Sequence, residues 1–143
     1  MDDDVRPLDD AEYDWLKSAV DRINSYLAKY YFDEEGEGRL DRTERDLKKA
    51  QEVFENERFT AAQKSELLAL GAVLGNVLAT NTRMEWAVVT NEFGTNLGLW
   101  HPDTGFVLYP LSMIVKRVEV GRTVDIPALY RSFVADLGLS SSG

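Results

Sequence analysis

Cysteine is absent from the 143 residues, and histidine occurs once, as His101. Without cysteine the chain has no disulfide, no thiolate nucleophile and no Cys-ligated zinc or iron–sulfur site. A lack of disulfides is ordinary in a reducing compartment, so we expect a cytoplasmic location. A single histidine gives no HExxH pair, and the sequence predicts neither a metal site nor a cofactor.

Long apolar runs are also missing. The most apolar stretch, Leu67 to Ala79, is interrupted by Gly71, Gly75 and Asn76. It is shorter than the roughly 20 residues that cross a bilayer. The first ten residues, MDDDVRPLDD, have no basic segment followed by an apolar one, so they do not resemble a secretory signal. We therefore expect no membrane partner.

Motifs for phosphate binding or covalent catalysis do not occur. No glycine-rich nucleotide loop and no nucleophile elbow is present. Ser112 is the serine best placed for a Ser–His pair, but the only histidine lies in a predicted turn. The sequence therefore predicts no catalytic residue and favours a protein that is not an enzyme.

Positive charge is scarce in one half of the chain. The formal net charge is −9, from 25 acidic and 16 basic residues. Residues 1–66 hold 19 of the acidic and 11 of the basic residues, whereas residues 67–143 are nearly neutral. An acidic surface repels nucleic acid and attracts basic partners, although it also serves solubility alone. We expect a protein partner and no nucleic acid.

Three helices are predicted in the N-terminal half, because apolar residues recur at steps of three and four. The first begins after Asp9 or Asp10, either of which can cap it, and ends near Phe32. The second spans residues 41–57. The third follows the capping-box pair Thr60 and Gln63 and runs to about residue 80. It is the most hydrophobic, so we expect it to be central.

After residue 80 the spacing of apolar residues changes from that of a helix to that of a strand. Residues 85–90, 96–100 and 106–109 are rich in β-branched and aromatic side chains and are separated by turns. Short connections favour an antiparallel meander. Two helices follow, one capped by Ser112 and ended by Gly121, the other capped by Asp125 with Pro127 in its first turn.

Together these elements predict one α+β domain over residues 1–143. The N-terminal helical part, 8–80, packs on a three-stranded antiparallel meander, which two C-terminal helices follow. The sheet and these helices occupy residues 84–138.

The C-terminal half carries a family resemblance. Its segments are LGAVLGNVL at 70–78, EWAVVTNEFGTNLGL at 85–99 and YPLSMIVKRVEVGRTVDI at 109–126. Residues 67–137 resemble the bacterial domain-of-unknown-function 3806 family. The resemblance implies a fold and a bacterial origin, and it brings no catalytic residues.

Binding residues are predicted from charge and from one turn. Residues 33–38, DEEGEG, form a solvated acidic loop whose spacing does not match a calcium-binding EF-hand. Trp100 and His101 end a strand, where an aromatic side chain either anchors a partner or covers the core edge. The predicted partner-binding residues are Asp33, Glu34, Glu35, Glu37, Glu44, Glu52, Trp100 and His101.

A second cluster is basic. Lys116, Arg117 and Arg122 either grip an anionic partner or pair with Glu119 on an exposed helix face. The leading hypothesis is an intracellular inhibitory protein, such as a bacterial immunity protein that neutralises a basic toxin. The alternative is a small-ligand-binding protein or enzyme with a pocket between the third helix and the sheet. Its polar groups would be Thr90, Asn91, Glu92, Ser112 and Arg117.

Overall fold

The computed structural model describes residues 4–30, 39–92 and 94–137. Within them, five helices and a four-stranded antiparallel sheet confirm the α+β class. The elements are β1 (Asp4–Pro7), α1 (Asp10–Tyr30), α2 (Arg45–Glu57), α3 (Lys64–Thr82), β2 (Glu85–Asn91), β3 (Gly94–Trp100), β4 (Val107–Leu108), α4 (Pro110–Glu119) and α5 (Ile126–Asp136).

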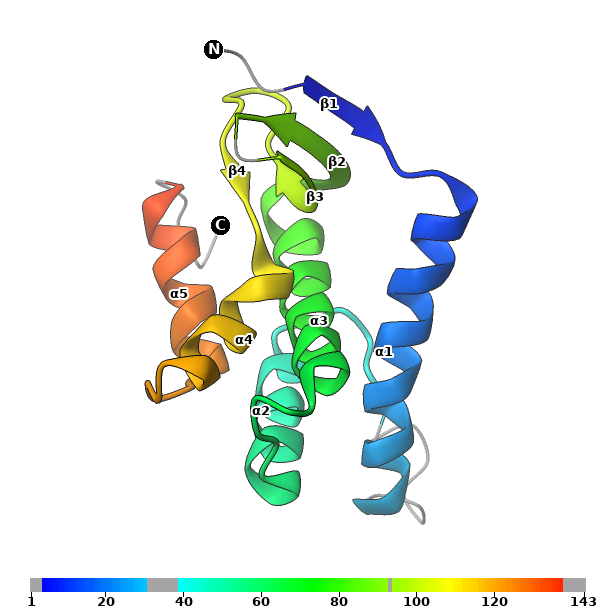
Figure 1. Cartoon of the computed structure of the whole chain (residues 1–143), viewed down its shortest axis with the longest axis vertical. Coiled ribbons are helices and arrows are strands. Elements are labelled where there is room, and N and C mark those ends of the chain that lie inside the picture. Colours follow the sequence, from blue (N-terminus) through cyan, green and yellow to red (C-terminus); the bar gives the residue numbers. More distant parts are fainter. Residues whose placement is uncertain (1–3, 31–38, 93, 138–143) are drawn as a thin grey trace.

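Helix α3 forms the centre of the molecule, as its composition predicts. Figure 1 shows it between α1 on one side and α4 with α5 on the other, with the sheet at its C-terminal end. Eleven of its residues are buried, including Leu70, Leu74 and Leu78. A helix that is apolar on all sides must be covered on all sides, and here its neighbours are the other four helices.

Two glycines let α3 approach its neighbours closely. A Cβ on Gly71 would lie 2.5 Å from the carbonyl oxygen of Pro110 and 2.7 Å from Cα of Leu111. A Cβ on Gly75 would overlap the indole of Trp86. The prediction that these glycines serve close packing is confirmed, with α4 and β2 as the partners.

The sheet has one strand more than the predicted meander. Its order is β1-β2-β3-β4, and β1 pairs antiparallel with β2, with Val5 opposite Val89. Strand β1 has only four residues, one of them proline, and its pairing partners lie 80 to 86 positions further along the chain. An edge strand of this kind has no alternating apolar pattern to reveal it.

Helix α1 starts with a reciprocal capping box. The carboxylate of Asp9 accepts a hydrogen bond from the Glu12 N–H at 2.8 Å, and Glu12 Oε1 accepts one from the Asp9 N–H at 2.9 Å. Arg6 of β1 also forms an ion pair with Glu12, at 2.9 Å. These contacts join the edge strand to the helix. The predicted cap at Asp9 is confirmed.

Other helix starts differ from prediction. Helix α2 begins at Arg45 and not at Asp41, because the buried carboxylate of Asp46 accepts hydrogen bonds from the N–H groups of Asp41 and Arg42. These bonds hold a turn in which Arg42 has a φ of 67°. Before α3, Gln63 Oε1 accepts from the Thr60 N–H, which is half of the predicted capping box.

The C-terminal helices follow their predicted signals more closely. Helix α4 begins at Pro110, because a missing N–H does no harm in a first turn, so Ser112 lies inside the helix and does not cap it. Gly121, with a φ of 73°, follows the last residues of α4 and ends that helix as predicted. Asp125 caps α5 by accepting a hydrogen bond from the Ala128 N–H at 3.0 Å.

Candidate functional site

Only two of the six predicted acidic partner-binding residues, Glu44 and Glu52, lie within the described residues. Asp33, Glu34, Glu35 and Glu37 lie outside the described residues. Glu44 is exposed just before α2, and Glu52 is half-buried within it. Six acidic residues fall in 1–3 and 31–38, so the described residues carry 19 acidic and 16 basic groups, a net charge of −3. Most of the negative charge therefore belongs to those two segments.

The other two predicted residues are neighbours with different surroundings. Trp100 is half-buried at the end of β3. His101 is buried, and its Nδ1 accepts a hydrogen bond from the Asp103 N–H at 3.2 Å. The backbone of His101 also bonds to Phe106 and Gly105 across the turn. His101 therefore shapes the turn, and its burial argues against the predicted contact with a partner.

Trp100 lines a groove of about 710 Å³ between α1, the C-terminal end of α3 and the sheet. We call it the Trp100 groove. Its aromatic side chains are Tyr13 from α1, Trp86 from β2 and Trp100 from β3. The remaining lining residues are Val5, Pro7, Leu16, Lys17, Val20, Asp21, Arg42, Asn76, Ala79, Met84, Glu85 and Ala87.

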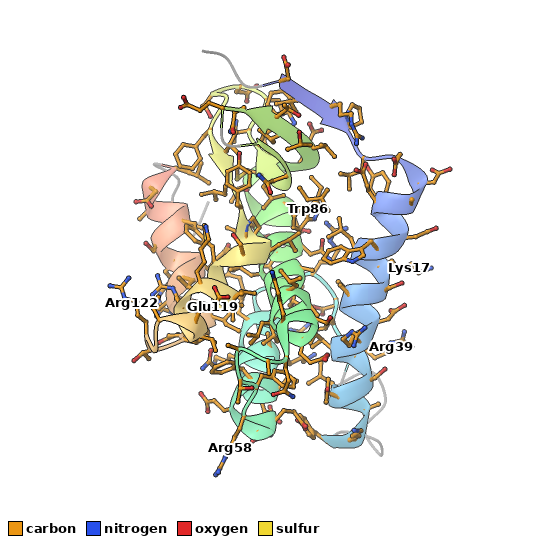
Figure 2. The ribbon with its side chains drawn as sticks, viewed as in Figure 1. Lys17, Arg39, Arg58, Trp86, Glu119 and Arg122 are labelled. Atoms are coloured by element: carbon orange, nitrogen blue, oxygen red, sulfur yellow. The ribbon has the colours of Figure 1, made fainter. Side chains whose placement is uncertain are left out.

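The wall formed by Trp86 is fixed on two sides. Its indole lies against Gly75 of α3, and its Nε1–H donates a hydrogen bond to Asn76 Oδ1 at 2.9 Å. The opposite wall is α1, where the phenol of Tyr13 is 56% exposed. Figure 2 labels Trp86 beside α3 and Lys17 on α1. The groove thus has one rigid aromatic wall and one aromatic side chain open to solvent.

The rim of the Trp100 groove carries charge of both signs. Lys17 and Arg42 provide cations, and Asp21 and Glu85 provide carboxylates. Among the described residues none of these four forms an ion pair; the ion pairs there are Arg6–Glu12, Arg22–Glu66 and Arg45–Asp41. The four rim charges therefore remain available to a bound molecule.

A second groove, of about 760 Å³, lies between α1, α3, the β2–β3 hairpin and α4. We call it the Trp15 groove, after an indole that is 41% exposed. Asn91 donates a hydrogen bond to the hydroxyl of Tyr109 at 3.1 Å along its wall. The lining residues are Trp15, Leu68, Asn91, Thr95, Asn96, Leu97, Tyr109, Leu111, Ser112 and Lys116.

The Trp15 groove unites part of the predicted ligand pocket. Asn91 and Ser112 both line it. The hydroxyl of Thr90 instead bonds to that of Thr95 on the exposed face, and Glu92 is exposed in the hairpin. Arg117 lines neither of these two grooves. Two of the five polar groups therefore meet, and no carboxylate or histidine lines this groove.

Comparison with known proteins identifies the family. The family model for a domain of unknown function, DUF3806, matches residues 46–130, which is more than half of the chain. The chain belongs to the DUF3806 family. The match begins at Asp46 and so includes α2, which the sequence resemblance left outside. No curated protein sequence matches this DUF3806 chain.

A solved structure from Bacteroides thetaiotaomicron VPI-5482 shares the fold. It superposes with a TM-score of 0.77 at 20% sequence identity. The superposition covers 94% of this DUF3806 chain and 48% of the other, so the chain spans about half the length of that protein. At this identity the similarity shows a common fold alone.

Across the described part of this DUF3806 chain, His, Asp and Glu side chains form no group of three that could hold a metal ion. No helix there is long and apolar enough to cross a membrane. Sequence reasoning missed Tyr13 and Trp86 as groove residues. The signal for Tyr13 was available, since it stands three residues before Leu16 and seven before Val20 and so continues the apolar face of α1.

Proposed function

We propose that this DUF3806 protein is a non-catalytic binding protein that holds a protein partner in the Trp100 groove. In the finer form of the proposal the partner is a toxin and the chain is its bacterial immunity protein. One observation carries the proposal: Tyr13, Trp86 and Trp100 line one concave surface, and Tyr13 is 56% exposed. Tryptophan and tyrosine are the residues most enriched at binding hot spots.

The construction of the groove supports tight binding. Because Trp86 is held by Gly75 and Asn76, it loses little freedom when a partner covers it. An aromatic side chain of the partner that enters between Trp86 and Tyr13 gains about 0.5–1.5 kcal/mol beyond burial alone. An arginine or lysine over the indole face gains a cation–π contact of similar size.

The rim charges would set which partner fits. Asp21 and Glu85 favour a basic side chain beside the aromatic wall, while Lys17 and Arg42 favour a carboxylate at the other positions. The negative charge of residues 1–38 would speed the approach of a basic partner over a longer range. This combination supports a basic toxin domain as the partner. The lining groups offer contact and charge, and they include no nucleophile paired with a base.

The test uses the protein encoded next to this chain in its native genome. Co-expression with the DUF3806 chain should restore growth if that neighbour is toxic, and calorimetry should give a direct complex. Tyr13→Ala should weaken the complex about tenfold, a common cost of losing one interface aromatic. Phe106→Ala is the matched control, since Phe106 is an exposed aromatic outside the groove. A neighbour that neither binds nor harms growth would remove the immunity form of the proposal.

We infer a second candidate function from the Trp15 groove, that of a small-ligand-binding protein or enzyme. Its volume lies within the roughly 300–1,000 Å³ typical of small-molecule sites. Asn91, Tyr109 and Ser112 offer hydrogen bonds beside the apolar side chains of Leu68, Leu97 and Leu111. A fragment screen by NMR should then give shifts at these residues, and Ser112→Ala should weaken the hits. An absence of hits at this groove would remove the candidate.

A further inference from the structure

A third groove lies between α4 and α5, on the opposite side of α3 from α1 (Figure 1). Its volume is about 530 Å³. Figure 2 labels two of its residues, Glu119 and Arg122, near the end of α4. We call it the α4–α5 groove, and its lining residues are Met113, Lys116, Arg117, Glu119, Val120, Arg122 and Phe133.

The groove is positively charged within an acidic protein. Lys116, Arg117 and Arg122 face one carboxylate, that of Glu119. Within residues 4–30, 39–92 and 94–137, none of the three cations forms an ion pair. The alternative in which they pair with Glu119 is therefore wrong, since no Glu119 oxygen lies within 4.0 Å of them. From Val107 to Leu137 the chain holds four basic and three acidic residues, against a net charge of −9 overall.

The end of α4 places Arg122 beside the other two cations. Gly121, at a φ of 73°, lets its N–H bond to the carbonyl of Val118 at 3.1 Å. The next N–H, that of Arg122, bonds back to the carbonyl of Arg117 at 2.8 Å. This pair of bonds is a Schellman motif, which ends a helix in a defined geometry. The backbone of Arg122 is thereby held against that of Arg117, the other arginine of the groove.

Apolar groups lie among the cations. Val120 is 69% exposed. Among the described residues, no other large hydrophobic side chain is as exposed. Phe133 of α5 is 9% exposed and forms the floor, and Met113 is half-buried. A bound phosphate or sulfate ion would leave these apolar groups uncovered. A ligand that matches the whole groove has carboxylates and an apolar side chain a few ångströms apart.

We propose that the α4–α5 groove binds an acidic segment of a protein partner. The carboxylates of that segment meet Lys116, Arg117 and Arg122, and one of its apolar side chains covers Val120 and the ring edge of Phe133. Arginine favours such a site because its planar guanidinium binds carboxylates in two parallel hydrogen bonds. This surface shares no lining residue with the Trp100 groove, so the proposal does not depend on the partner-binding function proposed above; Lys116 alone is shared with the Trp15 groove.

Charge and shape favour a peptide over other anions. A nucleic acid or an anionic bilayer extends well past three cations and would meet the negative field of the rest of the chain. The groove also has no exposed aromatic face on which a base could stack, since Phe133 is buried. A short acidic segment is confined to the groove and avoids that repulsion.

A structural role for the cations makes a different prediction. Lys116 and Arg117 lie in the last turn of α4, where cations stabilise the helix dipole by about 0.3–1 kcal/mol. In that role their loss would lower stability and leave peptide binding unchanged. Melting temperature and affinity therefore need to be measured on the same variants.

The probe is a fluorescein-labelled peptide of four glutamates and two leucines, measured by fluorescence anisotropy with the full chain. The double variant K116Q/R117Q should weaken binding at least tenfold, and Val120→Ser should weaken it severalfold. Arg131→Gln is the matched control, because this exposed arginine of α5 does not line the groove. A peptide with glutamine in place of glutamate should not bind.

Four results would overturn the proposal. The first is no binding of the acidic peptide at low salt. The second is equal binding of the glutamine peptide. The third is equal weakening by Arg131→Gln. The fourth is tighter binding of single-stranded DNA or of phosphatidylserine vesicles than of the peptide, which would assign the groove to another class of partner. Loss of affinity in K116Q/R117Q with an unchanged melting temperature supports the proposal directly.

Discussion

The indole of Trp86 lies against Gly75, and its Nε1–H donates a hydrogen bond of 2.9 Å to Asn76 on the same helix. This contact joins β2 to α3 and at the same time sets one wall of the Trp100 groove. The glycine is needed because any side chain there would overlap the ring. Packing of the core and the shape of the candidate site therefore depend on the same three residues.

Removing the partner of the indole should loosen that wall. Asn76→Ala leaves the Trp86 N–H without its acceptor in a partly buried position, and we expect a loss of about 1 kcal/mol of unfolding free energy. The Trp86 indole N–H resonance should also shift and exchange faster with solvent. An unchanged resonance would show that the hydrogen bond does not hold the ring.

Gly71→Ala tests the contact of α3 with α4. An alanine in a helix usually stabilises by about 1 kcal/mol relative to glycine, but here its Cβ would lie 2.5–2.9 Å from the backbone of Pro110 and Leu111. Backbone atoms cannot move aside cheaply, so we expect destabilisation by roughly 1–3 kcal/mol. Ser65→Ala on the exposed surface of α3 is the control and should change stability little. Stabilisation by Gly71→Ala would contradict the packing.

Asp9→Ala tests the link between β1 and α1. Loss of the capping box should cost about 1 kcal/mol, measured by urea unfolding. Asp10→Ala is the matched control, because Asp10 is an acidic residue of the same first turn whose side chain has no hydrogen-bond partner among the described residues. Equal losses in the two variants would place the effect in net charge and not in the cap.

Asp46 should make stability depend on pH. Burial raises the pKa of this carboxyl above its usual 3.8, so the folded chain takes up the proton at a higher pH than the unfolded chain. The contribution of Asp46 to stability is therefore fully present below pH 3.8 and is lost as the pH rises through the folded pKa. Asp46→Asn removes this titration, and unfolding free energies at pH 4 and pH 7 reveal it as a difference from wild type.

The carboxyl of Asp41, next to Asp46, has a lowered pKa and titrates below the pH 4 to pH 7 interval of that experiment. The Thr43 hydroxyl and N–H donate to Asp41 and lower its pKa to about 2. Its contribution is present above pH 3.8 and is lost only as the pH falls toward 2. Wild type should thus gain stability relative to Asp46→Asn between pH 7 and pH 4. A loss over the same interval would contradict the raised pKa of Asp46.

The sequence predicts the helices of this protein better than its grooves. The central position of α3 follows from its apolar residues alone, and the caps at Asp9 and Asp125 follow from local chemistry. The sequence does not predict strand β1, because nothing local distinguishes DVRP from a loop and its pairing with β2 depends on residues far along the chain.

The candidate site was foreseen only in part. Trp100 was predicted as an anchor from its place at a strand end, but its companions Tyr13 and Trp86 come from elements that only the fold brings together. The burial of His101 cannot be predicted from the sequence either, because the polar turn residues around it indicate exposure. Periodicity assigns a residue to a face of its own element, and it does not show which faces enclose a groove.

The central claim is that the Trp100 groove receives a protein partner. The most direct measurement is photo-crosslinking in the native cell, with p-benzoylphenylalanine placed at position 13 or, as a control, at position 106. We predict one discrete adduct from position 13 that is absent from position 106 and is lost with Lys17→Glu and Asp21→Lys together. No adduct from position 13, or the same adducts from both positions, would contradict the claim.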